Sequence, residues 1–202
     1  MKQFNLWPIP LLVDKIKLNP SWLSTAKKQK FEVYKDKTAS GTTYPYDFLD
    51  KVPDLKSIVQ DKINHYAYEV MKVKKEFTFP IQTSWVNKHI KGNWGGSHIH
   101  TNSMISGCVY LAQEKDSGNI VFERHWNYNN VFTSTLVPDY FERNNINASS
   151  FELNVEPGLI AIFPSTLQHY IQINQNKKER YSVAFNAFVR GKFGDAMNIV
   201  EV

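Results

Sequence analysis

The chain has 202 residues, of which 42% are hydrophobic and 14% aromatic. That is enough apolar surface for one folded domain and too much for a disordered chain. The single cysteine, Cys108, excludes an internal disulfide and a cysteine-rich zinc site, and we expect it to be a buried small hydrophobe. The net charge of +5 suits an acidic partner. Its basic residues are scattered in short clusters, however, which is more typical of a solvated surface than of a nucleic-acid footprint.

Nothing in the sequence indicates a membrane segment or an export signal. The longest apolar runs, such as "LIAIF" at 159–163, are far shorter than the ~20 residues that cross a bilayer. The first residues, "MKQFNLWPIPLLVDKIK", contain two prolines and lack the apolar core and small-residue cleavage site of a secretory signal. We therefore expect a cytoplasmic protein without a membrane partner.

The first third of the chain has the pattern of helices. Residues 54–73 place apolar side chains three and four positions apart, which predicts an amphipathic helix with one stripe facing the core. Pro53 and Asp54 are favourable residues for the first turn of that helix. A shorter helix is expected around 21–30. His65 lies off the apolar stripe, so we expect it at the surface.

After residue 76 the pattern changes to short apolar runs separated by Gly, Asn, Asp and Pro, which indicates an antiparallel β-sandwich or barrel. The seven runs are "FTFPIQTSWV", "ISGCVYLA", "NIVFER", "FELNVE", "GLIAIF", "HYIQIN" and "RYSVAFNAFV". No helical pattern lies between them, which argues against a parallel βαβ fold. The sequence predicts an α+β, mainly β protein. We expect one domain over 1–202, with helical support from 1–75 and a β core at 76–192.

Two of the six histidines lie within three positions, in "SHIHTNSMISGCVYL" at 97–111. Alternate residues of a strand point to the same side, so a strand would aim His98 and His100 at one point. A His-x-His pair is therefore a ready chelate for a metal ion. Stable protein sites generally use three or more ligands, so a third donor must come from elsewhere.

Among the other histidines, His169 is the best candidate for the third ligand. It follows the apolar run "GLIAIF", Pro164 and a tight connection, at the rim of an otherwise apolar hairpin. His89 precedes a loop in "VNKHIKGN" and has the features of an ordinary loop residue. His125 lies at the end of a predicted strand, and His65 lies on the surface of the predicted helix.

The run "RYSVAFNAFV" carries a candidate carboxylate-binding pair. In a strand, Arg180, Ser182, Ala184 and Asn186 share one face. A guanidinium and a hydroxyl side by side can bind a carboxylate through two or more hydrogen bonds. If the face is internal, it predicts a site for a small carboxylic acid. A polar face in contact with solvent is the alternative.

The order of these motifs resembles the Fe(II)/2-oxoglutarate-dependent oxygenases, in particular a small group akin to prolyl-hydroxylase-type enzymes. The motifs are His-x-His, then "SGCVYL", "GLIAIFPSTLQHY", Arg-x-Ser and "VAFNAF". The resemblance covers about residues 80–190, and the first 75 residues match only loosely. Together the motifs are specific, whereas none of them is specific alone.

The resemblance implies a double-stranded β-helix, a cupin-like jelly roll with iron in its open mouth. It implies that His98 and His169 are metal ligands and that Arg180 and Ser182 bind the distal carboxylate of 2-oxoglutarate. Tyr110 matches a tyrosine that often assists that carboxylate. The implied cofactor and cosubstrates are Fe(II), 2-oxoglutarate and O₂.

The sequence departs from the family at one ligand, because His100 stands two residues after the first histidine, where Asp or Glu is usual. If His100 is a ligand, the metal keeps its full 2+ charge and its complex with 2-oxoglutarate is neutral, which should strengthen cosubstrate binding. A second registration pairs His100 with Asn102 and leaves His98 outside, but an amide is a poor iron ligand. Glu114 and Asp116 are alternative carboxylate ligands with the character of turn residues.

The predicted activity is hydroxylation of an unidentified second substrate, coupled to the conversion of 2-oxoglutarate to succinate and CO₂. A peptidyl side chain is favoured and nucleic acid remains an alternative. Trp85, Asn87 and Trp94 are candidates for shaping the substrate mouth, although packing alone would explain the aromatic residues. Two other functions stay open: a three-histidine zinc hydro-lyase or hydrolase, which leaves Arg180 and Ser182 unexplained, and a cupin-like module that binds without turnover.

Overall fold

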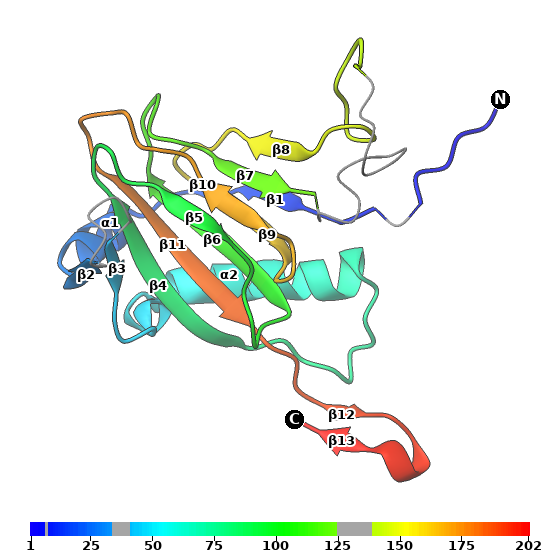
Figure 1. The fold of residues 1–202 in the computed structure, drawn as a ribbon. Helices are drawn as coiled ribbons and strands as arrows, with labels where there is room; N and C mark the ends of the chain where they lie inside the picture. Colours follow the sequence, from blue (N-terminus) through cyan, green and yellow to red (C-terminus); the bar gives the residue numbers. More distant parts are fainter. Residues whose placement is uncertain (7, 34–40, 125–138) are drawn as a thin grey trace.

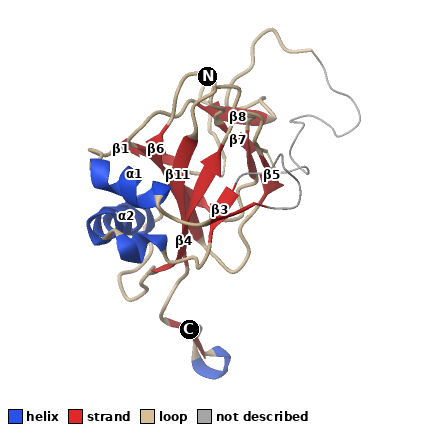
Figure 2. Ribbon diagram, turned by 90° about the vertical axis from the view of Figure 1, so that its left-hand side faces the viewer, coloured by secondary structure: helices blue, strands red, loops and turns tan. Residues whose placement is uncertain are grey.

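The computed structural model describes residues 1–6, 8–33, 41–124 and 139–202, and it has three layers. Two helices lie on one side, a seven-stranded sheet forms the middle, and a four-stranded sheet lies on the other side (Figures 1 and 2). The mainly β architecture with two facing antiparallel sheets confirms the predicted fold class. Among the described residues, no helix combines the length and apolar character that crossing a bilayer requires.

The seven-stranded sheet has the strand order β1-β9-β6-β11-β4-β3-β2, and all of its pairs are antiparallel. Its strands are β1 (Leu12–Lys15), β2 (Phe31–Val33), β3 (Gly41–Thr43), β4 (Ile81–His89), β6 (Ile105–Ala112), β9 (Leu159–Pro164) and β11 (Arg180–Ala187). The three strands from the N-terminal third were not predicted. They are short, and β1 lies at one edge of the sheet and β2 at the other, so their sequences lack a long apolar alternation.

The four-stranded sheet has the order β5-β10-β7-β8 and faces the large sheet. Its strands are β5 (Gly95–His98), β7 (Ile120–Glu123), β8 (Ser150–Leu153) and β10 (His169–Ile171). A small hairpin of β12 (Lys192–Phe193) and β13 (Val200–Glu201) projects from the body of the molecule (Figure 1). All seven predicted β runs contain a strand. β5 is not among these runs, because its sequence, "GGSH", has almost no β propensity. It lies where a strand carrying His98 and His100 was expected, and it ends at His98.

The two helices cover the outer face of the large sheet (Figure 2). Helix α1 (Pro20–Lys27) begins at Asn19, whose side chain accepts a hydrogen bond from the Ser21 amide, as a good N-cap does. Helix α2 (Pro53–His65) continues into a wider π-helical turn at 66–70. A hydrogen bond connects the two helices: the Trp22 indole of α1 donates to the Asp54 carboxylate of α2 at 2.8 Å. His65 is exposed, as predicted.

Alternate residues of the central strands point into two different cores. On β6, Val109 packs towards the helices, whereas Cys108 and Tyr110 pack between the two sheets. On β9, Ile160 and Ile162 face the helices in the same way. Strands buried on both faces appear as nearly continuous apolar runs, which is why "ISGCVYLA" and "LIAIFP" were easy to predict. The space between the sheets is only partly filled, and it holds the candidate site.

Candidate active site

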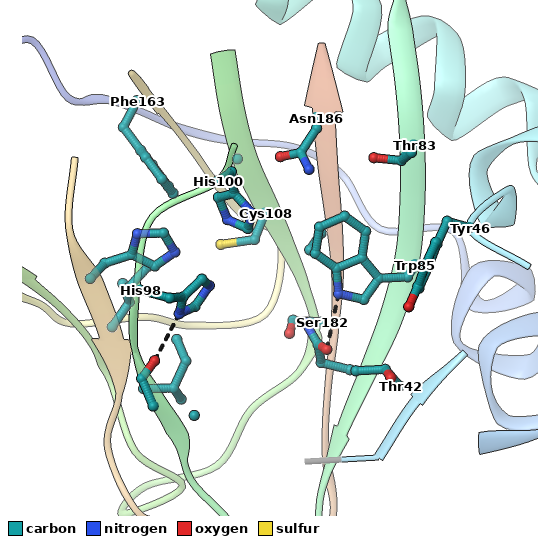
Figure 3. Close-up of a pocket in the computed structure, with 18 of the residues that line it drawn as sticks. Thr42, Tyr46, Thr83, Trp85, His98, His100, Cys108, Phe163, Ser182 and Asn186 are labelled. Carbon is teal, nitrogen blue, oxygen red and sulfur yellow. Dashed lines mark hydrogen bonds between the residues drawn. The ribbon is translucent and has the colours of Figure 1, made fainter. Parts of the chain in front are cut away.

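Three histidines converge at the mouth of the space between the sheets. One ring nitrogen from each of His98, His100 and His169 lies within 4.8 Å of the others. The ring centroids of His98 and His169 are 4.4 Å apart, and His100 lies 5.0 Å from the first and 5.2 Å from the second. Figure 3 shows His98 and His100 turned towards the same space. Three imidazoles at such separations can bind one divalent transition-metal ion.

The backbone that brings the three rings together differs from the expected strand. β5 ends at His98, which pairs directly with His169, the first residue of β10. His100 lies beyond the end of the strand, where its amide donates to the Ser165 carbonyl at 3.0 Å. His98 and His100 do lie close together, but the prediction that one strand carries both was wrong. The polar, glycine-rich β5 ends early, and a hydrogen bond to the turn before β10 holds His100 instead.

Hydrogen bonds fix the tautomers of two of the histidines. Nδ1 of His98 lies 2.7 Å from the Gly96 carbonyl, and Nδ1 of His169 lies 2.8 Å from the Leu167 carbonyl. A carbonyl oxygen can only accept, so both Nδ1 atoms carry a proton, and in the neutral form of each ring Nε2 presents the lone pair. Such second contacts orient the ring of a metal-ligating histidine.

Burial keeps two of the rings neutral. Desolvation, helped by the neighbouring His169 and His98, lowers the pKa of His100 to about 3. Burial lowers the pKa of His169 to about 4, although the Leu167 carbonyl acts in the opposite direction. A metal ion therefore meets unprotonated nitrogens on these two residues at neutral pH and displaces no proton from them.

The histidines border a cavity of about 680 Å³ whose opposite wall is built by β4 and β11. Four pairs of side chains from these strands line the cavity: His89 with Arg180, Asn87 with Ser182, Trp85 with Ala184, and Thr83 with Asn186. The face of β11 that carries Arg180 and Ser182 is thus internal, which removes the alternative of a solvent-exposed polar face. The His89–Arg180 pair is the most buried of the four.

Arg180 and Tyr110 carry unused hydrogen-bonding groups at this buried end. Arg180 is 1% exposed, and its Nη1 donates to the Gly118 carbonyl at 3.3 Å. Its guanidinium lies 5.3 Å from the centre of the Tyr110 ring. Within the described part of the chain, neither Nε of Arg180 nor the hydroxyl of Tyr110 has a hydrogen-bond partner. Buried polar atoms are rarely left without a partner, so these groups are available to a bound anion.

His89 is the residue that the sequence analysis placed wrongly. It is the last residue of β4, not part of a loop, and its side chain is only 2% exposed. Neither ring nitrogen has a hydrogen-bond partner among the described residues. Desolvation and the nearby positive charge of Arg180 hold the pKa of His89 well below its ordinary value. A single histidine before a glycine-containing loop gives no sign of this burial.

The outer part of the cavity carries aromatic and amide side chains. The Trp85 indole donates to Oδ1 of Asn87 at 3.1 Å, and the Trp85 ring lies 5.8 Å from the His100 ring. Tyr46 lies edge-on against Trp85 at 5.9 Å, and Trp94 is 39% exposed at the opening. Trp85, Asn87 and Trp94 thus all line the cavity, and a role for them at a substrate mouth stays a prediction.

The two alternative carboxylate ligands lie in the turn after β6. Glu114 forms an ion pair with Lys178 at 2.7 Å, in the turn after β6. Asp116 belongs to the same turn and has a positive φ of 62°. Neither belongs to the three-histidine cluster, which is the only such group among the residues that the structure describes. Asn102 lines the same cavity as the three histidines. His125 lies outside the described residues.

A family model described as "Putative 2OG-Fe(II) oxygenase" matches residues 83–186, which are 104 of the 202 residues. The chain belongs to the 2OG-Fe(II) oxygenase family. It is thus a 2-oxoglutarate-dependent oxidoreductase, as the resemblance implied, and Fe(II) and 2-oxoglutarate are the family's metal and cosubstrate. The matched segment runs from the middle of β4 to the end of β11 and contains the three histidines, Tyr110, Arg180 and Ser182.

Solved structures support the fold of this oxygenase. It is similar to the non-heme alpha ketoglutarate dependent carbocyclase SnoK from nogalamycin biosynthesis, with a TM-score of 0.61, 10% identity, and coverage of 89% of this chain and 79% of that one. It is also similar to HygX from Streptomyces hygroscopicus, solved with nickel, 2-oxoglutarate and hygromycin B. The TM-score is 0.56 and the identity 12%, with coverage of 89% of this chain and 82% of that one. For a prolyl-4-hydroxylase from Pseudomonas putida the TM-score is 0.51 and the identity 13%, with coverage of 91% of this chain and 94% of that one. No curated protein matches the sequence significantly.

Proposed function

We propose that this oxygenase hydroxylates a second substrate in a reaction that converts 2-oxoglutarate and O₂ to succinate and CO₂. One observation supports the proposal most strongly. Three convergent imidazoles and a buried, incompletely bonded arginine line the same cavity. Bound Fe(II) supplies the oxidising chemistry, and the residues of the chain bind, orient and enclose the reactants.

His98, His100 and His169 would hold the metal through one nitrogen each. Their donor set fits Fe(II), because imidazole is a common ligand of iron and three protein ligands leave room for a cosubstrate and O₂. The same set also fits Zn²⁺. A zinc hydrolase, however, would give no role to Arg180, whose buried charge calls for an anionic partner.

Arg180, Ser182 and Tyr110 would bind the distal carboxylate of 2-oxoglutarate. A buried guanidinium offers the carboxylate a charge-assisted hydrogen bond that is stronger than a neutral one. Burial raises the pKa of Tyr110 well above its ordinary value, so the phenol keeps its proton and can donate. Ser182 pairs with Tyr110 across β11 and β6, which places both hydroxyl-bearing residues beside the same stretch of wall.

A three-histidine site gives the complex a different charge from the usual one. Three neutral imidazoles leave the ion with a charge of 2+, and 2-oxoglutarate carries 2−, so the complex is neutral. We propose that this charge balance strengthens cosubstrate binding, because transfer of an ion into a partly buried site is costly unless its charge is compensated.

The second substrate is proposed to be a peptidyl side chain, and nucleic acid is the alternative. Trp85, Asn87 and Trp94 would form its mouth, and their neutral amide and aromatic groups offer no charged anchor for a phosphate backbone. The similar prolyl-4-hydroxylase supports a peptide. We also propose that the protein is cytoplasmic and that 1–202 form one domain, which the insertion of β1–β3 into the large sheet supports.

The test is succinate formation from 2-oxoglutarate by the full chain, with and without added Fe(II) under air. We expect Fe(II)-dependent succinate release in the wild type and none in His169→Ala, whereas His65→Ala keeps the wild-type rate. Metal analysis after anaerobic purification separates the zinc enzyme from the iron enzyme. A wild-type protein that binds 2-oxoglutarate and never forms succinate would instead be a non-catalytic binding module.

A further inference from the structure

We propose that His89 is a fourth carboxylate-binding residue, which donates a ring N–H to the distal carboxylate of 2-oxoglutarate beside Arg180. The inference rests on the proposed function, because it takes the cavity to hold 2-oxoglutarate. The family match and the sequence motifs assign no role to His89. The structure assigns one through the position of this residue, its burial and its missing hydrogen bonds.

The position of His89 is fixed by the pairing of two strands. His89 ends β4 and lies directly opposite Arg180, the first residue of β11. Both side chains line the cavity, and both are nearly inaccessible, at 2% and 1% exposed. A group that Arg180 binds from one strand is therefore beside the imidazole on the next strand.

The hydrogen-bond inventory at this end of the cavity calls for a ligand. Four buried polar atoms have no partner among the described residues: both ring nitrogens of His89, Nε of Arg180 and the Tyr110 hydroxyl. Leaving such buried atoms unpaired destabilises the folded chain, so several of them rarely occur in one place without a ligand. A carboxylate has two oxygens with about four acceptor positions and can take donors from all three residues.

The charges favour a neutral imidazole in this role. The charged group that acts on His89 is Arg180 from β11, and Arg180 in turn interacts with Tyr110 and Cys108 from β6. Burial raises the pKa of both the phenol and the Cys108 thiol, which leaves the guanidinium as the only charge in this group. The arginine then balances the carboxylate, and neutral His89 adds a donor without surplus charge.

The competing explanation is that His89 only fills space at the end of β4. Packing and carboxylate binding differ in what they predict for a cosubstrate without the distal carboxylate. 2-Oxobutyrate has the same 2-oxo acid head as 2-oxoglutarate and lacks that carboxylate. A residue that binds the distal carboxylate affects only 2-oxoglutarate, whereas a packing defect affects both acids.

The experiment measures binding of 2-oxoglutarate and 2-oxobutyrate to the Mn(II)-loaded full chain by anaerobic calorimetry. It compares the wild type with His89→Leu, which has no donor, and His89→Gln, which keeps an amide donor. His65→Gln is the matched control, because His65 is an exposed histidine on α2. Thermal unfolding of each variant verifies that it is folded. If His89→Leu does not fold, His89→Gln provides the answer.

For His89→Leu we expect the affinity for 2-oxoglutarate to fall about 10- to 100-fold, the range for a lost hydrogen bond to a charged group. The affinity of His89→Gln for 2-oxoglutarate should fall less, and the affinity of both variants for 2-oxobutyrate should stay the same. Unchanged 2-oxoglutarate affinity in both folded variants overturns the inference and leaves the proposed function intact. An equal loss for the two acids also overturns it. A wild type that does not bind 2-oxoglutarate overturns the proposed function itself.

Discussion

At the scale of single residues, His100 is the departure from the family pattern with the clearest chemical consequence. Its ring lies 5.0 Å from His98 and 5.2 Å from His169, although the strand ends before it. An imidazole adds no charge to the metal site, whereas the carboxylate expected there would add one negative charge. As the proposed third ligand, His100 would therefore change the electrostatics of the site while keeping the number of ligands.

The charge argument predicts the behaviour of His100→Asp. The variant should still bind Mn(II), because a carboxylate is a good ligand for a divalent ion. Its affinity for 2-oxoglutarate should fall at least about tenfold, since a new negative charge lies close to an anionic cosubstrate. Calorimetric titration of the metal-free protein measures Mn(II) binding, and titration of the Mn(II)-loaded protein measures the affinity for 2-oxoglutarate. His65→Asp makes the same charge change at an exposed position, and equal or tighter binding by His100→Asp would contradict the argument.

The role of Arg180 leads to a second prediction at this scale. Arg180→Ala should lower the affinity for 2-oxoglutarate about 100-fold or more, because it removes the one positive charge at the buried end of the cavity. Mn(II) binding should be unchanged, since Arg180 does not belong to the histidine cluster. Titration of each ligand separately measures the two effects. If the affinity for 2-oxoglutarate is unchanged, the assignment of Arg180 is wrong.

Single residues differ in how well the sequence predicts them. His98, His169 and Arg180 belong to motifs whose order resembles a known family, so their convergence on one cavity could be expected. His89 could not be identified in this way. Its burial depends on the pairing of β4 with β11, two strands about 90 positions apart in the chain, and its local sequence is that of a loop. Non-local pairing of this kind leaves no local signal.

At the scale of the elements, β6 shows how closely the strands of the large sheet pack. Gly107 lies in β6 opposite Ile162 of β9 and Phe185 of β11. A methyl group added at Gly107 would lie 2.4 Å from the Ala161 carbonyl oxygen and 2.5 Å from the Phe185 ring. Backbone cannot yield as a flexible side chain does, so only glycine fits here.

This close packing predicts that Gly107→Ala destabilises the protein by about 1–3 kcal/mol, the usual cost of overpacking a core. Chemical denaturation followed by circular dichroism measures the free energy of unfolding. Gly96→Ala is the matched control, because a methyl group there meets nothing nearer than the Trp94 ring at 3.5 Å. Equal stability of the two variants would show that β6 and its neighbours can separate more easily than the contacts imply.

The strands also differ in how visible they are in the sequence. β6, β9 and β11 are buried on both faces and stand out as apolar runs. β5 carries two glycines, a serine and a histidine, and its pairing with β10 comes from tertiary contact. The element that positions His98, the first of the proposed metal ligands, was thus the hardest to predict. Its chemistry was visible in the histidines, and its geometry was not.

At the scale of the whole molecule, the architecture separates support from chemistry. Helices α1 and α2 bury the outer face of the large sheet, while the inner face and the small sheet enclose the cavity (Figure 2). The proposed metal ligands come from the small sheet and the segment after β5, and the proposed carboxylate-binding residues come from the large sheet. Binding of a metal and a cosubstrate would therefore connect the two sheets across the cavity.

The central claim is a three-histidine metal site facing a carboxylate site. The most direct test is a crystal structure of the anaerobic complex with Mn(II) and 2-oxoglutarate, with the ion located by its anomalous scattering. We predict one ion bound by His98, His100 and His169, with the distal carboxylate of the cosubstrate against Arg180. An ion that lacks His100 as a ligand, or a cosubstrate whose distal carboxylate lies away from Arg180, would contradict the account.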